Sequence, residues 1–124
     1  MKILIADDSK LLQDRIVSMV ENCDFNVEIK QVFNTIMAKE ALLAEKIDIV
    51  ISDIRMPGGG GLELLQFIKD KFPGIKVIVM TNYPYPQYKD RANTLGAEFF
   101  LNKSEELENL VPILSDINSS TINK

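Results

Sequence analysis

Short apolar runs alternate with amphipathic segments along the whole chain, and this alternation constrains the fold more than any other feature. The runs lie near residues 2–6, 27–32, 48–52, 75–80 and 97–102. Such alternation predicts an α/β domain with a mostly parallel sheet. The runs at 2–6, 48–52 and 75–80 are almost entirely apolar, which is typical of strands covered by helices on both faces. The run at 27–32 alternates apolar and polar residues, so we expect it to form an edge strand.

Each amphipathic segment predicts a helix with one apolar face directed at the sheet. Ser9 is a good N-cap for the first helix, and Thr35 is a candidate N-cap for the second. The fourth helix is expected to begin at Pro86 and to end at Gly96, which can adopt the left-handed cap conformation. The expected inward-facing residues of the first three helices are Leu12, Ile16, Met19, Cys23, Met37, Ala38, Ala41, Leu42, Leu62, Leu65, Ile68 and Phe72.

The last helix is expected to begin near Asn109, because Pro112 in a helix interior would remove a hydrogen bond and clash with the preceding turn. With 124 residues, the chain has room for one compact domain. We expect this domain to span residues 1–118 and residues 119–124 to form a short polar tail that frays.

Composition narrows the classes of function. A net charge of −4 argues against a basic nucleic-acid-binding surface. The single cysteine, Cys23, cannot form an intramolecular disulfide, which fits a reducing cytoplasm. The start of the chain reaches acidic residues too early for a signal peptide, and no apolar run approaches the ~20 residues of a membrane span. We therefore expect a cytoplasmic protein that does not enter the membrane.

Polar residues follow the apolar runs at the points where a parallel sheet would gather them along one edge. These residues are Asp7, Asp8, Asp53, Thr81 and Lys103. An acidic pair before a helix is weak evidence by itself, since helix starts favour such residues as caps. Three neighbouring carboxylates, however, would repel one another and have raised pKa values unless a cation joined them. The expected companion is a hard divalent cation, which prefers oxygen ligands.

The segment from Asp53 to Pro57 reads DIRMP, and Gly61 follows four residues later. Together with the acidic pair and Lys103, this segment resembles the phosphorylation motif of bacterial response-regulator receiver domains, and the resemblance runs from about Met1 to about Asn118. It implies a flavodoxin-like fold, a doubly wound five-stranded parallel sheet of order 2-1-3-4-5 with five helices. It also places Asp53 at the phosphoacceptor position.

The resemblance implies a Mg²⁺ (or Mn²⁺) site with named ligands. Asp8 and Asp53 would bind the ion directly, and Asp7 would act mainly through water. The backbone carbonyl of Arg55 would supply another oxygen. No histidine or thiolate ligand is needed, because Mg²⁺ accepts carboxylate, carbonyl and water oxygens.

The resemblance also implies a conformational switch. Lys103 would offset charge on the transferred group, and the hydroxyl of Thr81 would bond to it. Phe100 would then turn inward, although the sequence equally allows Phe100 to be a static core residue, with Phe99 on the opposite face. The fourth helix, fifth strand and fifth helix would form the output surface, which a homodimer could also use.

Ser104 departs from the commonest pattern of the family, and the residues two positions after Asp53 and Thr81 are bulky. Lys103 is followed by Ser104, where many receivers have a cis proline. A cis peptide bond before a residue other than proline costs ~3 kcal/mol, so we do not expect one here. Arg55 and Tyr83 lie two residues after Asp53 and Thr81, at positions that in the family influence water access to the acyl phosphate. We expect these bulky side chains to slow self-dephosphorylation.

The sequence therefore predicts a two-component phosphoacceptor that serves as a switch more than as a turnover enzyme. The chain has no histidine, so the phosphoryl donor must be another molecule, such as a sensor histidine kinase or a histidine phosphotransfer protein. The output protein is unknown, and no DNA-binding helix-turn-helix unit is expected after Lys103. Alternatives are a phosphorelay intermediate that passes the group to a histidine phosphotransfer protein, and a receiver-like module that works without phosphorylation.

Two further classes of protein are disfavoured. Aspartate-based phosphatases usually carry a second aspartate two residues after the nucleophile, whereas this chain has Arg55 there. A flavodoxin-like electron carrier would need a Ser/Thr-rich phosphate loop after the first strand. Asp7 and Asp8 occupy that place and would repel a flavin phosphate.

Overall fold

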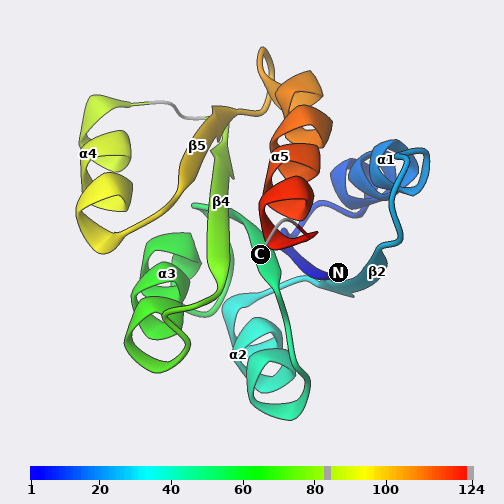
Figure 1. Cartoon of the computed structure of the whole chain (residues 1–124). Helices are drawn as coiled ribbons and strands as arrows, with labels where there is room; N and C mark the ends of the chain where they lie inside the picture. Colours follow the sequence, from blue (N-terminus) through cyan, green and yellow to red (C-terminus); the bar gives the residue numbers. More distant parts are fainter. Residues whose placement is uncertain (83–84, 123–124) are drawn as a thin grey trace.

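The computed structural model describes residues 1–82 and 85–122, which form a central sheet with helices on both faces (Figure 1). The strands are β1 (Lys2–Ala6), β2 (Glu28–Val32), β3 (Ile49–Asp53), β4 (Lys76–Thr81) and β5 (Phe99–Asn102). The helices are α1 (Lys10–Glu21), α2 (Thr35–Ala44), α3 (Gly60–Lys71), α4 (Pro86–Leu95) and α5 (Leu110–Ile122), with a short 3₁₀ turn η1 (Leu107–Asn109) before α5.

All strand pairs are parallel, and the order β2-β1-β3-β4-β5 confirms the expected topology. β3 is buried along its whole length, as its apolar sequence predicts. β2 alternates exposed and partly buried residues and lies at one edge of the sheet, which confirms the edge-strand prediction. Because β1 and β3 are neighbours, the residues that follow β1 lie beside the end of β3.

Alternate residues of the strands face two separate apolar layers. Ile3, Ile5 and Ile51 pack in the layer that contains α1 and α5. Leu4 and Val50 pack in the layer that contains α2, α3 and α4. Figure 1 shows these two groups of helices on opposite sides of the sheet.

The helix ends follow local capping chemistry. The Ser9 side chain accepts a hydrogen bond from the Leu12 amide, which confirms the first predicted cap. The N-cap of α2 is Asn34 and not Thr35, because the Asn34 side chain reaches the amide of Met37. Helix α4 begins at Pro86 and ends at Gly96 in the left-handed conformation, as predicted.

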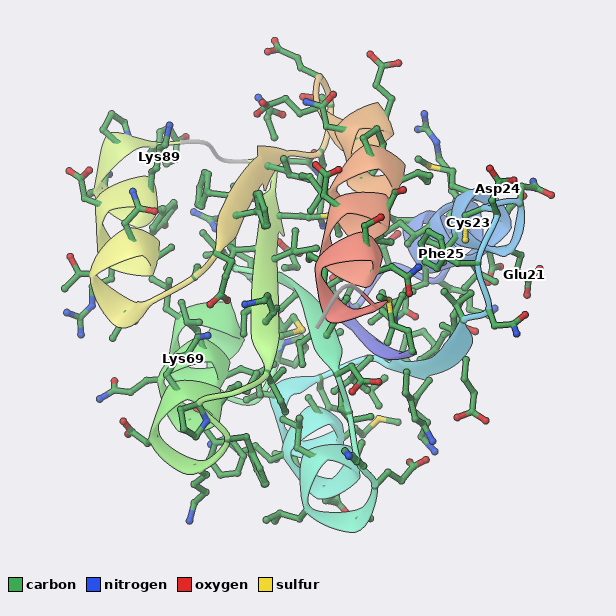
Figure 2. All side chains as sticks on the ribbon, in the orientation of Figure 1. Glu21, Cys23, Asp24, Phe25, Lys69 and Lys89 are labelled. Carbon is green, nitrogen blue, oxygen red and sulfur yellow. The ribbon has the colours of Figure 1, made fainter. Side chains whose placement is uncertain are left out.

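The buried face of α1 differs from the predicted one. It consists of Gln13, Ile16 and Val20, while Leu12 and Met19 lie partly buried at its sides. Cys23 is not on the helix, because α1 ends at Glu21, and Figure 2 shows Cys23 in the connection to β2. On α2, Met37 is likewise 40% exposed and lies outside the buried set.

Helix α5 begins at Leu110, one residue after the predicted start near Asn109, and follows the 3₁₀ turn at residues 107–109. Pro112 falls within the first helical turn, where its missing N–H costs nothing. Helix α5 extends to Ile122, beyond the predicted end of the domain at residue 118. The last turn of α5 thus lies in the segment predicted as a tail, and the boundary of the domain at residue 118 stays a prediction. Among the described helices, none has both the length and the apolar character of a membrane span.

Candidate functional site

The structure brings the five predicted polar residues to the carboxyl-terminal edge of the sheet. Asp7 and Asp8 directly follow β1, Asp53 is the last residue of β3, and Thr81 is the last residue of β4. Lys103 directly follows β5. Ligand sites of open α/β sheets lie at this edge, beyond the strand ends.

The three aspartates converge. One carboxylate oxygen from each of Asp7, Asp8 and Asp53 lies within 4.8 Å of the other two. Asp7 is completely buried and Asp53 is 6% exposed, whereas Asp8 is exposed to solvent. The cluster is thus closed toward the sheet and open toward water on the side of Asp8.

Lys103 lies against two of these aspartates. Its Nζ is 2.6 Å from Oδ2 of Asp7 and 2.9 Å from Oδ2 of Asp53. The Lys103 amide donates to the carbonyl of Thr81 at 2.9 Å, so the β4–β5 ladder continues to the residue that carries the ammonium group. Charge-assisted contacts of this length hold the lysine against the Asp53 carboxylate.

Burial raises the pKa of the Asp53 carboxyl above its ordinary value. The hydrogen bond and the charge of Lys103 act in the opposite direction. The charge of Asp7 raises the pKa further, and a backbone hydrogen bond from Arg55 lowers it. The net direction is upward, so the fold disfavours the ionised carboxylate and would gain from an additional cation beside it.

The connection from β3 to α3 runs through Gly58, Gly59 and Gly60, which have φ angles of 90°, 126° and 85°. These left-handed conformations require glycine. Thr35 tethers the loop, because its amide donates to the Pro57 carbonyl at 3.0 Å and its hydroxyl donates to the Gly60 carbonyl at 3.3 Å. The loop that follows Asp53 therefore has a defined path.

Gly61 is needed for a different reason. A Cβ atom at this position would lie 1.9 Å from the carbonyl oxygen of Asp53. The Gly61 amide donates to the Ile54 carbonyl at 2.8 Å. The start of α3 thus packs directly on the backbone of Asp53.

A hydrogen-bonded turn follows Lys103. The side-chain oxygen of Asn102 accepts from the amide of Ser104 at 2.9 Å and from its hydroxyl at 2.7 Å. Glu106 accepts from the Asn102 amide at 3.0 Å and donates its own amide to the Asn102 carbonyl at 2.8 Å. The described residues contain no cis peptide bond, in agreement with the expectation for Lys103–Ser104.

The two residues of the predicted switch lie where the strand pattern placed them. Thr81 is completely buried. Phe100 is partly buried against the layer of α2, α3 and α4, whereas Phe99 is exposed on the other face. This arrangement agrees with the expected alternation, and the movement of Phe100 stays a prediction.

Arg55 reaches from the loop after β3 to α4. Its Nη2 donates to the hydroxyl of Tyr88 at 3.4 Å. The rings of Tyr85 and Tyr88 lie 5.7 Å apart at the start of the same helix. The contact between Arg55 and Tyr88 was not predicted from the sequence. Tyr83 lies outside the described residues.

The donor set fits a small hard cation. All three side chains of the cluster offer carboxylate oxygens, and no sulfur or imidazole donor is among them. Magnesium prefers such oxygens and retains several waters, which the exposed side of Asp8 can accommodate. The cluster and the raised pKa of Asp53 therefore both suit a divalent cation.

Comparisons with known proteins agree with this geometry. The family model of the response regulator receiver domain matches residues 3–115. The transcriptional regulatory protein DesR from Bacillus subtilis is 34% identical over 88% of this chain, and the response regulator GacA from Pseudomonas aeruginosa is 30% identical over 94%. This chain spans about half the length of each relative, 55% and 54% respectively.

A solved structure supports the same assignment. A DNA-binding response regulator of the LuxR family from Staphylococcus aureus is 30% identical and superposes with a TM-score of 0.83 over 94% of this chain and 98% of that one. A CheY-like receiver domain from Methanospirillum hungatei shares the fold with a TM-score of 0.86 at 23% identity, covering 98% of this chain and 96% of its own. The chain thus belongs to the response regulator receiver domain family of two-component signalling.

Proposed function

We propose that this chain accepts a phosphoryl group on Asp53 from a phosphohistidine of another protein. The observation that carries the proposal is the placement of a buried carboxylate at the end of β3, 2.9 Å from the Lys103 ammonium and beside two further aspartates. The raised pKa of Asp53 supports a cation at this site, because a positive charge beside a buried carboxylate stabilises its ionised form. The donor is a sensor histidine kinase or a histidine phosphotransfer protein.

The proposed step is an in-line displacement at phosphorus. An oxygen of Asp53 forms a bond to phosphorus while the phosphorus–nitrogen bond of the donor breaks. The imidazole nitrogen keeps the electron pair and takes up a proton. Lys103 lies close enough to Asp53 to offset negative charge on the transferring group.

Asp8, Asp53 and the Arg55 carbonyl are the proposed direct ligands of Mg²⁺ or Mn²⁺, which would supply charge neutralisation and orientation. Asp7 is proposed to act through water. Its Oδ2 contacts Lys103 and its Oδ1 accepts the Ser9 amide at 2.8 Å, so both oxygens already have partners. This occupancy supports a water-mediated role for Asp7.

We propose that phosphorylation switches the surface formed by α4, β5 and α5. The Thr81 hydroxyl would bond to the phosphoryl group, and Phe100 would turn toward the space left by Thr81 and its loop. The partly buried position of Phe100 supports such a rearrangement, since it needs no exit from a tightly packed core. The surface would then bind an output protein, or a second copy of this chain.

The first test is intact-mass analysis after incubation with acetyl phosphate or phosphoramidate, with and without Mg²⁺. We expect one added phosphoryl group on the wild-type protein in the presence of Mg²⁺, and none on Asp53→Asn. Asp8→Asn should retain the acceptor but require much more Mg²⁺. No addition to a protein that binds Mg²⁺ would instead support a receiver-like module regulated by protein contact alone.

A phosphorelay role is the alternative within this function. It predicts that the phosphorylated chain returns its group to a histidine phosphotransfer protein. Hydrolysis without such transfer to any tested phosphotransfer protein would favour the terminal switch.

Arg55 and Tyr83 are proposed to prolong the phosphorylated state. The contact between Arg55 and Tyr88 supports this proposal for Arg55, because it holds the arginine side chain between the acceptor loop and α4. Arg55→Ala and Tyr83→Ala should each shorten the lifetime of the acyl phosphate, measured as loss of the phosphoryl mass over time. Unchanged lifetimes in both variants would refute it.

A further inference from the structure

Gln13 is a completely buried polar residue on the inner face of α1, where its neighbours Ile16 and Val20 are apolar. Its Nε2 donates to the main-chain carbonyl of Asp7 at 2.9 Å and also to the carbonyl of Val32. The Asp7 amide donates to the same Val32 carbonyl at 3.2 Å. One carboxamide thus joins α1, the residue that follows β1, and the end of β2.

The bonded carbonyl of Asp7 belongs to the peptide unit that connects Asp7 to Asp8. Because a peptide unit is planar, a hydrogen bond to its oxygen fixes the orientation of the whole unit. The Asp8 side chain is exposed, so its direction depends on this backbone more than on packing. Gln13 therefore restrains the position of Asp8 relative to Asp7 from the buried face of α1.

Helix packing alone does not explain a glutamine here. An apolar residue would fill the same inner face without burying polar atoms, whose burial is costly unless they are hydrogen-bonded. The Gln13 Oε1 atom is buried and accepts no hydrogen bond from the described protein residues. The carboxamide is held through its donor side, which is the side that faces Asp7 and Val32.

We infer that Gln13 is a positioning residue that sets the affinity of the acidic pair for a divalent cation through the peptide unit between Asp7 and Asp8. The inference rests on the proposed metal-dependent function. Outer partners of metal ligands typically change metal affinity by 10–100-fold when replaced. Loss of the Gln13 donors should weaken Mg²⁺ binding by about tenfold, near the lower end of that range.

The test compares Gln13→Met with Val20→Ala in the metal-free and Mg²⁺-bound protein. Methionine matches the length of glutamine without its donors. Val20 is a fully buried residue of the same helix that packs in the apolar layer, so Val20→Ala controls for general loss of stability. Mg²⁺ affinity is measured by calorimetry, and hydrogen exchange of the Asp7, Asp8 and Ser9 amides is measured in the absence of metal.

Gln13→Met should raise the Kd for Mg²⁺ about tenfold and speed exchange at these three amides, whereas Val20→Ala should leave the Kd within about twofold of wild type. Equal Kd values for the wild type and Gln13→Met would overturn the inference while leaving the proposed function intact. Absence of Mg²⁺ binding to the wild type would instead refute the metal-dependent function itself.

A measurement on the wild type covers the case in which Gln13→Met does not fold. The two side-chain amide protons of Gln13 should exchange slowly with solvent and shift during a Mg²⁺ titration followed by NMR. The positioning role would be overturned by rapid exchange of the Gln13 side-chain amide protons. It would also be overturned if their resonances stayed constant during the Mg²⁺ titration while those of Asp8 shifted.

Discussion

Lys2 lies at the amino-terminal edge of the sheet, where the parallel strands begin, and Lys103 lies at the carboxyl-terminal edge, where they end. Each of these lysines contacts two carboxylates. Lys2 begins β1 and forms ion pairs with Glu28 at 3.5 Å and with Glu45. Lys103 follows β5 and contacts the two aspartates described above. The charge sets are alike, but the Lys2 side chain is 23% exposed and the Lys103 side chain is 7% exposed.

This difference in burial reverses the direction in which the fold shifts the carboxyl pKa at Glu45 and at Asp53. The Lys2 hydrogen bond lowers the pKa of Glu45, and the same bond raises the pKa of Lys2, so both ionised forms are favoured. At the other edge, burial raises the pKa of Asp53 although Lys103 lies beside it. The same pairing of charges is a surface contact near Lys2 and a buried cluster near Lys103, because only the second is removed from water.

The largest expected effect comes from Lys103→Met. This change leaves Asp7 and Asp53 buried without their shared cation, and breaking a buried charge contact typically costs about 3 kcal/mol or more. Urea unfolding should therefore show a loss of about 3 kcal/mol in the free energy of unfolding, together with a strongly reduced rate of phosphorylation. Added Mg²⁺ should restore more stability to this variant than it adds to the wild type, since it would replace the missing positive charge. A loss no greater than that of Lys2→Met would break the comparison between the two edges.

Glycines provide a second contrast between the edges. Gly61→Ala would place a Cβ atom 1.9 Å from the Asp53 carbonyl oxygen, so we expect a loss of about 2–3 kcal/mol in unfolding free energy and slower phosphorylation. Gly74→Ala is the matched control, because Gly74 precedes β4 at the opposite edge and a Cβ there would meet nothing within 4 Å. Its expected change is within about 0.5 kcal/mol. Similar losses of unfolding free energy in the two variants would show that α3 does not pack on the Asp53 backbone as described.

Asp53→Asn should stabilise the metal-free protein at neutral pH by a few degrees in Tm. The folded-state pKa of Asp53 is raised, so the folded protein holds this proton more tightly than the unfolded chain does. Ionisation of Asp53 therefore lowers the free energy of unfolding of the wild type as pH rises from the ordinary aspartate pKa of about 3.9 through the raised value. The variant does not ionise at this position and lacks this loss of stability. The difference in Tm between variant and wild type should therefore shrink as pH falls. A variant less stable than the wild type at neutral pH would mean that attraction to Lys103 outweighs burial.

The smallest effect is expected for Lys2→Met. Its ion pairs reach solvent, where screening and side-chain entropy leave little net stabilisation. Because the pKa of Glu45 is lowered, its small contribution is present above the ordinary glutamate pKa and disappears as pH falls through the lowered value. Thermal unfolding at low and high salt should show a slight change in Tm that added salt reduces further.

The sequence predicted the strands and the site residues because both depend on simple rules. Buried parallel strands need nearly continuous apolar runs, and the carboxyl ends of such strands meet at one edge. Asp7, Asp53 and Lys103 could therefore be brought together without coordinates. The order of the strands came from the family resemblance, and the structure confirmed it.

The local support of the site could not be predicted in the same way. The predicted inner face of α1 did not contain Gln13, although the spacing of three and four residues among Gln13, Ile16 and Val20 is the signal that could have found it. The N-cap of α2 was placed one residue too late, since Asn34 and Thr35 are adjacent caps and only backbone geometry separates them. The contact from Arg55 to Tyr88 joins distant segments and leaves no pattern in the sequence.

The position of Tyr88 has an optical consequence. The chain contains three tyrosines and no tryptophan, so its near-ultraviolet emission arises from tyrosine alone. Two of these rings, Tyr85 and Tyr88, lie together at the start of α4, and Tyr88 accepts a hydrogen bond from Arg55, two residues after Asp53. The unlabelled protein thus carries its own fluorophore in contact with the loop that follows Asp53. We expect the proposed phosphorylation of Asp53 to change the tyrosine emission, which would follow the reaction in real time.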